Sequence, residues 1–577
     1  MATISPVDPD KYIGTVIFVN SSQVQANLPL ASAQPERRAL SRGGVGDFVF
    51  IDCERVKLLG RITEVRIPDA ERLSVEPQLG TPIPPNPIGR IQLLSTVTDG
   101  DTKLARGVNA YPKIGDGVFL ASADILAQMI GKSATKSGEI NIPVGMIEAG
   151  GQGVTVELPP EKLFGRHCGV FGATGGGKSW TIAGLIEQIK AQSGKAIIFD
   201  PTGEFCDMAS IDTVFAFEAN IPDARHVHFP YTEITEDDLF SLFRPSGQSQ
   251  GPKLRDAVRS LKLVRAVGNA VPPGVHIQNG IVEKAGRQRA PFFGAVQANA
   301  AAIHSPKCNF DITNLAEQIK QECVWGTAPN NAANFGGTDN NAASYCESLS
   351  SRIATLINSH ELECLFQTHG TSLVDEVGNF LDDNERDVAL ISFKEVRFEH
   401  STRELLLNII GRYLLGLARE GRFRGAPIVV FLDEAHQFLG RTIGDEYGSV
   451  RLDSFGLIAK EGRKYGLTTV LATQRPRDIP QDVLSQLGTL IVHRLTNEQD
   501  RNTVDHACGD LDRAAAQFIP MLAPGEAIII GPDLPTPLPL RILRPTSPPD
   551  SKGPQFQSHW VERHLQRLAA AEPENTE

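Results

Sequence analysis

The residues with the clearest chemical potential lie at 172–179, where the sequence reads Gly-Ala-Thr-Gly-Gly-Gly-Lys-Ser. This segment fits the spacing G-x-x-x-x-G-K-[ST], follows a short apolar run and opens an amphipathic segment. Glycines let the backbone turn tightly enough for its N–H groups to surround phosphate oxygens, and the following helix N-terminus favours an anion. A chance glycine-rich turn is the alternative, which the spacing and context disfavour. The predicted nucleotide contacts are Gly172, Ala173, Thr174, Gly175, Gly176, Gly177, Lys178, Ser179 and Trp180.

Within this loop, two side chains have distinct expected tasks. Lys178 would reach the β- and γ-phosphates of ATP, and Ser179 would hold Mg²⁺. Both expectations require the loop to join a strand to a helix. The sequence therefore predicts an ATP and Mg²⁺ site built on a nucleotide-binding sheet.

Two pairs of acidic residues follow predicted strands and suit the rest of such a site. Asp433 and Glu434 come directly after the very apolar run 428–432. A buried strand that delivers an acidic pair is typical of P-loop ATPases, so Asp433 would orient the Mg²⁺ shell and Glu434 would polarise the attacking water. Asp200 and Glu204 end another strand pattern and would line the same crevice. For this second pair, an ordinary Asp-Pro turn with a solvated glutamate is the alternative.

A polar residue after a further strand pattern, Gln474, adds a candidate contact to the γ-phosphate. It follows the apolar run 468–472 closely. Since ligands bind beyond the carboxyl ends of strands in open α/β sheets, Gln474 would lie beside the acidic pair. The alternative is a plain turn at the end of the strand.

The order of strand and helix patterns predicts an α/β fold with a RecA-like P-loop ATPase core. Short β patterns with Gly-Asp and Pro-rich breaks before residue 125 predict a small N-terminal β-barrel. Helical patterns and polar loops then interrupt the core, which indicates a helical insertion. The expected ranges are 1–150 for the barrel, 151–235 and 386–545 for the two parts of the core, 236–385 for the insertion and 546–577 for a C-terminal tail.

Composition narrows the class of protein. The 577 residues are 41% hydrophobic and 21% charged, as in soluble globular proteins, and the net charge of −12 argues against a uniformly basic surface. A basic central channel remains compatible with that balance. The eight cysteines include no C-x-x-C pair, which speaks against a zinc site or a disulfide framework. With no membrane-spanning run or signal segment, we expect a cytoplasmic protein without membrane contact.

Several motifs taken together resemble those of a known family, the HerA-type hexameric DNA translocases and helicases of the HerA/FtsK superfamily of P-loop ATPases. The phosphate loop is specific by itself, and the others gain weight from their order along the chain. The matching segments are Gly-Arg-His (165–167), the phosphate loop, Asp-Pro-Thr-Gly-Glu (200–204), Leu-Asp-Glu-Ala-His (432–436), Glu-Gly-Arg-Lys-Tyr-Gly (461–466), Ala-Thr-Gln-Arg-Pro (472–476) and Pro-Gly-Glu-Ala-Ile-Ile-Ile-Gly (524–531).

The resemblance implies a homohexameric ring with ATP between subunits and double-stranded DNA in a central channel. It also implies an arginine supplied in trans, which maps to Arg463, and an arginine supplied in cis, which maps to Arg166. A guanidinium suits both tasks because it stays charged and stabilises the transferred phosphoryl group. For Arg463, an ordinary surface position on a helix is the alternative.

Relatives of this kind commonly work with a nuclease, and some accompany sirtuin-like NAD-hydrolysing effectors in anti-phage defence. The predicted barrel lacks a stripe of basic and aromatic residues, so we favour oligomerisation or docking of such a partner there over base stacking. The resemblance thus implies an ATP-driven DNA motor in repair or defence. An ATPase scaffold that assembles an effector enzyme is the second hypothesis. A secretion or conjugation ATPase is the third, weakened because we find no membrane segment.

Overall fold

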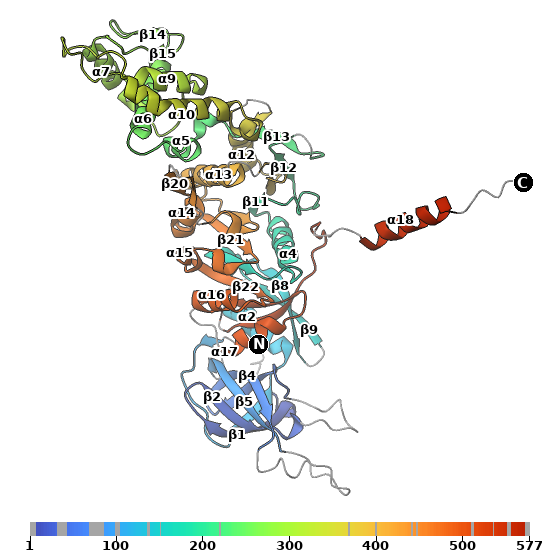
Figure 1. Cartoon of the computed structure of the whole chain (residues 1–577). Coiled ribbons are helices and arrows are strands. Elements are labelled where there is room, and N and C mark those ends of the chain that lie inside the picture. Colours follow the sequence, from blue (N-terminus) through green and yellow to red (C-terminus); the bar gives the residue numbers. More distant parts are fainter. Residues whose placement is uncertain are drawn as a thin grey trace, which may run out of the picture.

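The computed structural model describes residues 7–31, 43–68, 86–98, 104–134, 139–149, 152–218, 221–366, 370–397, 401–439, 442–445, 448–508, 513–532, 534, 536–550 and 556–571. A barrel, a large sheet with helices on both faces and a group of helices follow one another along one axis (Figure 1). The helix α18 (Phe556–Ala571) stands apart from these three parts. This arrangement confirms the predicted α/β class with an N-terminal barrel and a helical insertion.

The N-terminal barrel is a closed ring of six strands, to which the short strand β6 adds an edge. Its sheet has the order β2-β1-β7-β3-β4-β5-β6, and a pairing between β2 and β5 closes the ring. The alternation of the sequence explains the inward face: in β2, Val24 and Ala26 are buried, while Gln23 and Gln25 are only half-buried. The strands are β1 (Tyr12–Val19), β2 (Gln23–Asn27), β3 (Phe48–Cys53), β4 (Val56–Arg66), β5 (Ile88–Thr98), β6 (Ala105–Arg106) and β7 (Gly117–Leu120).

The central sheet has the strand order β16-β13-β12-β17-β11-β18-β21-β10-β22-β23-β24-β8-β9. From β16 to β22 all neighbours are parallel, and the pairs from β22 to β9 are antiparallel. Continuous apolar runs form these strands because helices cover both faces. The strands that carry the site are β10 (His167–Phe171), β11 (Lys195–Asp200), β18 (Ile428–Leu432), β21 (Leu467–Thr473) and β22 (Leu487–His493), and the others are β8 (Ile142–Ala149), β9 (Gln152–Leu158), β12 (Thr213–Ala216), β13 (Arg225–His228), β16 (Thr371–Ser372), β17 (Val388–Ser392), β23 (Glu526–Ile530) and β24 (Leu538–Ile542).

Different helices cover the two faces of this sheet. On one face, α4 (Lys178–Ala191) packs Ile182 and Ile186 into a core with Val170 of β10. On the other face, α13 (Thr402–Arg419) and α14 (Ser454–Glu461) pack into the core that contains Phe171. Alternate residues of β10 therefore point into two cores, which fixes the strand that precedes the phosphate loop.

The expected boundary at residue 150 falls between two strands of one hairpin. β8 and β9 pair with each other, and β8 also pairs with β24 at the edge of the central sheet. The barrel strands end with β7, and α2 (Ala123–Ala134) leads from them to the hairpin. β8 belongs to the core sheet because one of its two partners, β24, is a core strand far away in sequence.

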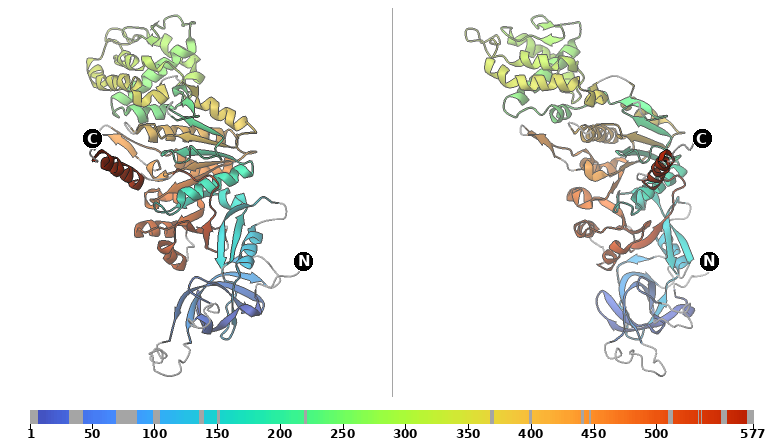
Figure 2. Two further views of the ribbon diagram at one scale, coloured as in Figure 1. Left: turned by 90° about the vertical axis from the view of Figure 1, so that its right-hand side faces the viewer. Right: turned by 45° about the vertical axis from the view of Figure 1, so that its right-hand side comes forward.

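The helices of the insertion lie at the end of the molecule remote from the barrel (Figure 2). A buried polar network holds them: Lys284 pairs with Glu322, which also accepts hydrogen bonds from Ser260 and Gln318. Each charged group is thus paired inside the core. The helices are α5 (Glu236–Phe243), α6 (Gln250–Val267), α7 (Arg289–Ala298), α8 (Ala300–Ile303), α9 (Leu315–Glu322), α10 (Asn340–Ile357), α11 (Glu363–Phe366) and α12 (Leu373–Asp382).

The tail that follows β24 runs back over the core before α18 begins. The backbone N–H groups of Thr546 and Ser547 donate to the carboxylate of Glu187 on α4, at 2.9 and 2.7 Å. Asp550 N donates to the carbonyl of Glu204 at 2.8 Å.

Among the described helices, none combines the length and apolar content that crossing a bilayer requires.

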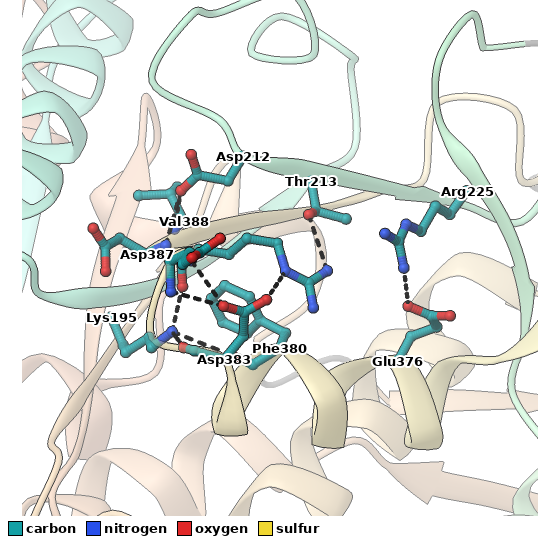
Figure 3. Close-up of polar contacts among 11 residues, drawn as sticks. Lys195, Asp212, Thr213, Arg225, Glu376, Phe380, Asp383, Asp387 and Val388 are labelled. Atoms are coloured by element: carbon teal, nitrogen blue, oxygen red, sulfur yellow. Dashed lines mark hydrogen bonds and ion pairs between the residues drawn. The ribbon is translucent and has the colours of Figure 1, made fainter.

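A lysine joins the end of the insertion to the sheet (Figure 3). The ammonium of Lys195, at the start of β11, donates to the carbonyl oxygens of Phe380, Asp383 and Arg386, beyond and within the last turn of α12. Its Nζ also lies 4.7 Å from the centre of the Phe380 ring. One cation therefore satisfies three acceptors where α12 returns the chain to the core.

Replacing this lysine should destabilise the core. Lys195→Met leaves three carbonyls without their donor, and we expect a loss of about 2 kcal/mol in the free energy of unfolding, measured by urea unfolding. Arg225→Met is the matched control, because it removes one half-exposed guanidinium from a single ion pair with Glu376 in the same region and should cost less than Lys195→Met. Equal losses for the two variants would contradict this role of Lys195.

Candidate nucleotide-binding site

The phosphate loop connects the central strand β10 to α4, as the sequence predicted. Gly175 and Gly177 have φ values of 75° and 115°, a region that favours glycine, and Gly177 is the N-cap of α4. Three backbone hydrogen bonds hold the loop from outside: Gly172 N to Thr473 O at 3.3 Å, Ala173 N to Arg494 O at 2.9 Å and Gly525 N to Gly176 O at 3.1 Å. The ends of β21 and β22 and the turn before β23 thus fix its shape.

A histidine that the sequence did not single out lies beneath the loop. His493, the last residue of β22, is buried and contacts Thr181 Oγ1 at 2.8 Å and the carbonyl of Glu526 at 2.9 Å. A Cβ on Gly172 would lie 2.7 Å from its Cβ, so glycine is required for this approach. Burial lowers the pKa of His493 to about 4, so the ring is neutral at pH 7. A histidine at the end of an apolar strand carries no sequence signal for this position.

Lys178 and the acidic pair meet at the start of α4. The Lys178 ammonium lies 2.6 Å from Glu434 Oε1 and 3.5 Å from Asp433 Oδ1, and all three side chains are largely buried. Burial lowers the pKa of Lys178, but the two carboxylates outweigh burial and leave it above its ordinary value. Lys178 is therefore a charged group held among anions.

The two carboxylates of the pair differ in their ionisation. Burial raises the pKa of Asp433 to about 7, and Lys178 offsets this only in part. Burial also raises the pKa of Glu434, but the hydrogen bond with His436 and the charge of Lys178 outweigh it and bring the pKa to about 2. At neutral pH, Glu434 is thus the ionised partner of Lys178.

Glu434 has an unusual backbone in addition to its buried side chain. Its φ of 46° lies in the left-handed region, which is uncommon for a residue with a side chain. The imidazole Nδ1 of His436 lies 3.1 Å from Glu434 Oε2, on the side away from Lys178. Residues with a strained backbone are common at functional sites, and here Lys178 and His436 hold the side chain of such a residue.

Gln474 links the phosphate loop to the acidic pair. Its Nε2 donates to Glu434 Oε1 at 3.3 Å, and its Oε1 accepts from Thr174 Oγ1 at 2.7 Å. The amide therefore contacts both the loop and the residue expected to act on water. Gln474 thus lies directly after β21 and beside the acidic pair, as its place in the sequence predicts.

Glu204 approaches the same point from the end of β11. Burial raises the pKa of Glu204 above its ordinary value, and the hydrogen bond with Ser179 and the charge of Lys178 offset this only in part. Buried oxygens of Glu204 and Asp433 have no hydrogen-bond donor, and oxygen is the ligand that Mg²⁺ prefers. In the described part of the chain, no group of three or more His, Cys, Asp or Glu side chains could hold a metal by itself. Mg²⁺ here would need further oxygens, such as those of phosphates.

Asp200 has a different surrounding from the one expected for a nucleotide contact. Oδ1 accepts from Thr202 N at 3.1 Å and from Gly203 N at 2.7 Å, and Oδ2 accepts from Phe205 N at 2.9 Å. The side chain is fully buried. Both oxygens are therefore engaged in shaping the turn that carries Glu204, as in an Asp-Pro turn.

The remaining predicted contact of the loop, Trp180, is partly open to solvent. It lies in the first turn of α4 with 37% of its surface exposed. The residues at the tip of the loop, Thr174 and Gly175, are also exposed. The loop thus opens to the outside of the subunit beside Trp180.

Arg166 and Arg463 lie at the other edge of the sheet. Arg166 precedes β10 and Arg463 precedes β21, two parallel strands, whereas the phosphate loop follows β10. Five residues of strand at about 3.3 Å each separate the two edges by roughly 17 Å. Both arginines are exposed. Burial, assisted by the charge of Arg463, lowers the pKa of His167, the first residue of β10, to about 4. The expectation that Arg166 acts in cis therefore does not fit the placement of Arg166 within one subunit.

Two substitutions separate the tasks of the central residues. Lys178→Ala removes the cation that faces the phosphates, so we expect ATP turnover to fall roughly 10²-fold or more.

Glu434→Gln keeps the shape of the side chain but removes the carboxylate that acts as the base. ATP should therefore still bind, while the measured kcat falls about 10²- to 10⁴-fold. Normal turnover by Lys178→Ala, or loss of nucleotide binding by Glu434→Gln, would contradict these assignments.

Comparison with known proteins identifies the family of this chain. Residues 142–399 match the family described as the helicase HerA central domain, and residues 405–529 match the helicase HerA-like C-terminal domain. Together these ranges cover more than half of the chain. They contain the phosphate loop, the acidic pair, Gln474 and both arginines.

Two relatives in sequence agree with this assignment. A probable helicase of Methanocaldococcus jannaschii is 25% identical over 78% of this chain and 75% of its own. The DNA double-strand break repair helicase HerA of Pyrococcus furiosus is 22% identical over 74% and 73%. Among solved structures, VirB4 of Thermoanaerobacter pseudethanolicus gives a TM-score of 0.47 at 14% identity, over 71% of this chain and 98% of that one. From its two matching domains and its site, the chain belongs to the HerA-type family of P-loop ATPases.

Proposed function

We propose that this ATPase is a double-stranded DNA translocase or helicase that works as a homohexameric ring. The observation that carries the proposal is the separation of Arg463 from the phosphate loop of its own subunit. A site for phosphoryl transfer needs positive charge on its open side, and a neighbouring subunit can bring Arg463 there. The HerA proteins of several archaea are named as DNA double-strand break repair helicases, which supports DNA as the substrate.

In this mechanism, each residue at the loop edge has one task. Lys178 and the loop N–H groups bind the β- and γ-phosphates of ATP, and Ser179 and Asp433 would hold Mg²⁺, which would supply positive charge beside the phosphates. As Lys178 turns from Glu434 to the phosphates, the carboxylate of Glu434 loses its ion pair and becomes a stronger base for the attacking water. Gln474 contacts Glu434 and the loop, so its contacts would change when the γ-phosphate binds, and this change would be passed to β21.

The two arginines act from a neighbour in this proposal. Arg463 would stabilise the charge that develops on the transferred phosphoryl group, as an arginine finger does. Arg166 lies at the same edge, so we now propose that it also faces the neighbouring site. Its side-chain stem covers Gly488, where a Cβ would lie 2.4 Å from that of Arg166.

The barrel is our proposed docking site for an effector, either a nuclease or a sirtuin-like NAD-hydrolysing enzyme, in repair or anti-phage defence. Large apolar side chains are exposed where the end of β1 meets the loop before β7. Tyr111 donates its hydroxyl to Ser21 O at 3.2 Å and Gly115 N donates to Val16 O at 2.8 Å, which brings the loop beside β1. An apolar patch of this kind suits a protein partner. The patch comprises Ile17, Phe18, Tyr111 and Ile114.

The same patch favours a second candidate function, an ATPase ring that mainly assembles and activates its effector. One assay distinguishes the two functions. A motor should hydrolyse ATP several-fold faster with double-stranded DNA, measured as phosphate release at saturating ATP with and without linear duplex. An ATPase rate that is unchanged by DNA but rises when the effector is added would contradict the motor function and favour the scaffold function.

Mixed rings test whether Arg463 acts across subunits. Arg463→Ala alone should retain ATP binding and lose roughly 10³- to 10⁵-fold in rate. Rings assembled from Lys178→Ala and Arg463→Ala subunits contain interfaces where an intact loop faces an intact arginine, so phosphate release should return. A dilution series of each variant with wild-type subunits is the control, because it shows whether one inactive interface stops ATP hydrolysis by the whole ring. If mixing restores nothing while diluted wild-type subunits keep proportional activity, Arg463 does not act in trans.

A further inference from the structure

An arginine of the barrel lies between aromatic rings of the barrel and of the ATPase core. The guanidinium carbon of Arg61, on β4, is 4.1 Å from the centre of the Phe518 ring and 5.4 Å from that of Phe48. Its Nε donates to the carbonyl of Gly46 at 3.0 Å, which orients the guanidinium plane. Phe518 ends α17 (Arg513–Phe518) of the core. The stack is thus a specific contact between the two parts of the molecule.

The chain that follows Phe518 leads directly to the phosphate loop. Its first part, η11 (Ile519–Met521), begins with Ile519, which is buried in the core. Seven residues after Phe518, Gly525 N donates to Gly176 O at 3.1 Å, and a Cβ on Gly177 would lie 3.3 Å from Gly525 Cα. The next residue, Glu526, offers its carbonyl to His493 beneath the loop at 2.9 Å. Residues 518–526, here called the connecting segment, therefore touch the barrel at one end and the loop at the other.

We propose that Arg61 is a positioning residue for ATP binding, acting through the connecting segment on the phosphate loop. The hydrogen bond from Gly525 sets the plane of the peptide between Gly176 and Gly177. That peptide carries the Gly177 N–H, which precedes the N-terminus of α4 and belongs to the phosphate-binding set. A shift of the connecting segment would turn this donor away from the phosphates.

The stack suits this task because its strength depends on geometry. A cation over an aromatic face contributes when the plane is aligned and the contact is partly shielded from water, as it is for the half-buried Arg61 and Phe518. A protein bound to the barrel could move β4 and so alter the affinity for ATP. The inference itself needs only the ATPase activity and holds for either candidate function.

The test compares two arginines that both join the barrel to the core. Arg61→Met keeps the apolar stem but removes the guanidinium, and we expect the Kd for a fluorescent ATP analogue and the KM for ATP to rise about three- to tenfold, with kcat nearly unchanged. Arg106→Met is the control, since Arg106 Nη1 donates to Pro532 O at 2.6 Å, beyond the end of β23 that is remote from the loop. It should leave the KM within about twofold of wild type.

Substitution of the partner ring completes the test. Phe518→Leu should raise the KM as Arg61→Met does, Phe518→Tyr should retain wild-type affinity, and the double variant of Arg61→Met with Phe518→Leu should be no worse than either alone. Arg61→Lys keeps the charge without the plane and provides a milder variant if Arg61→Met folds poorly. The proposal is overturned if Arg61→Met changes thermal stability but not KM, if Arg106→Met matches it, or if the effects of Arg61 and Phe518 simply add.

Discussion

The common direction of the parallel strands is the constraint on which the rest of the structure depends. Because β11, β18, β21, β10 and β22 run the same way, the segments that follow them meet at one edge. That edge gathers the phosphate loop, both acidic pairs, Gln474 and His493. The same constraint sends residues that precede the strands to the other edge, where Arg166 and Arg463 lie. In the proposed mechanism, a single subunit therefore contributes to two sites, one at each edge of its sheet.

At the edge of the sheet that carries the phosphate loop, the pKa values of the carboxyl groups depend on the small number of cations beside them. Lys178 lies among Asp433, Glu434 and Glu204, and burial raises the pKa of Asp433 and Glu204 above their ordinary values. Glu434 alone of these three has a lowered pKa, because it has both Lys178 and His436 as close partners. Magnesium and an arginine would add the positive charge that ATP hydrolysis needs. In the proposed ring, the neighbouring subunit would supply the arginine.

Much of this arrangement could be predicted from local sequence. The glycines of the loop, the apolar strands and the acidic pair each carry a local signal, and the structure brings Lys178, Glu434 and Gln474 together as expected. The engagement of Asp200 is local, and the Asp-Pro turn was the alternative interpretation of its sequence. The position of His493 beneath the loop and the pairing of β8 with β24 depend on contacts between distant segments, which no local pattern encodes. The edge occupied by Arg166 could have been deduced, since a residue before β10 cannot lie beside the loop that follows it.

The most direct test of the account is a structure of the assembled protein with Mg²⁺ and a non-hydrolysable ATP analogue. We expect the Arg463 guanidinium of one subunit to lie about 3 Å from a γ-phosphate oxygen bound by the phosphate loop of its neighbour, with Arg166 at the same interface. A nucleotide whose γ-phosphate contacts only residues of its own subunit, with Arg463 in solvent, would contradict the account.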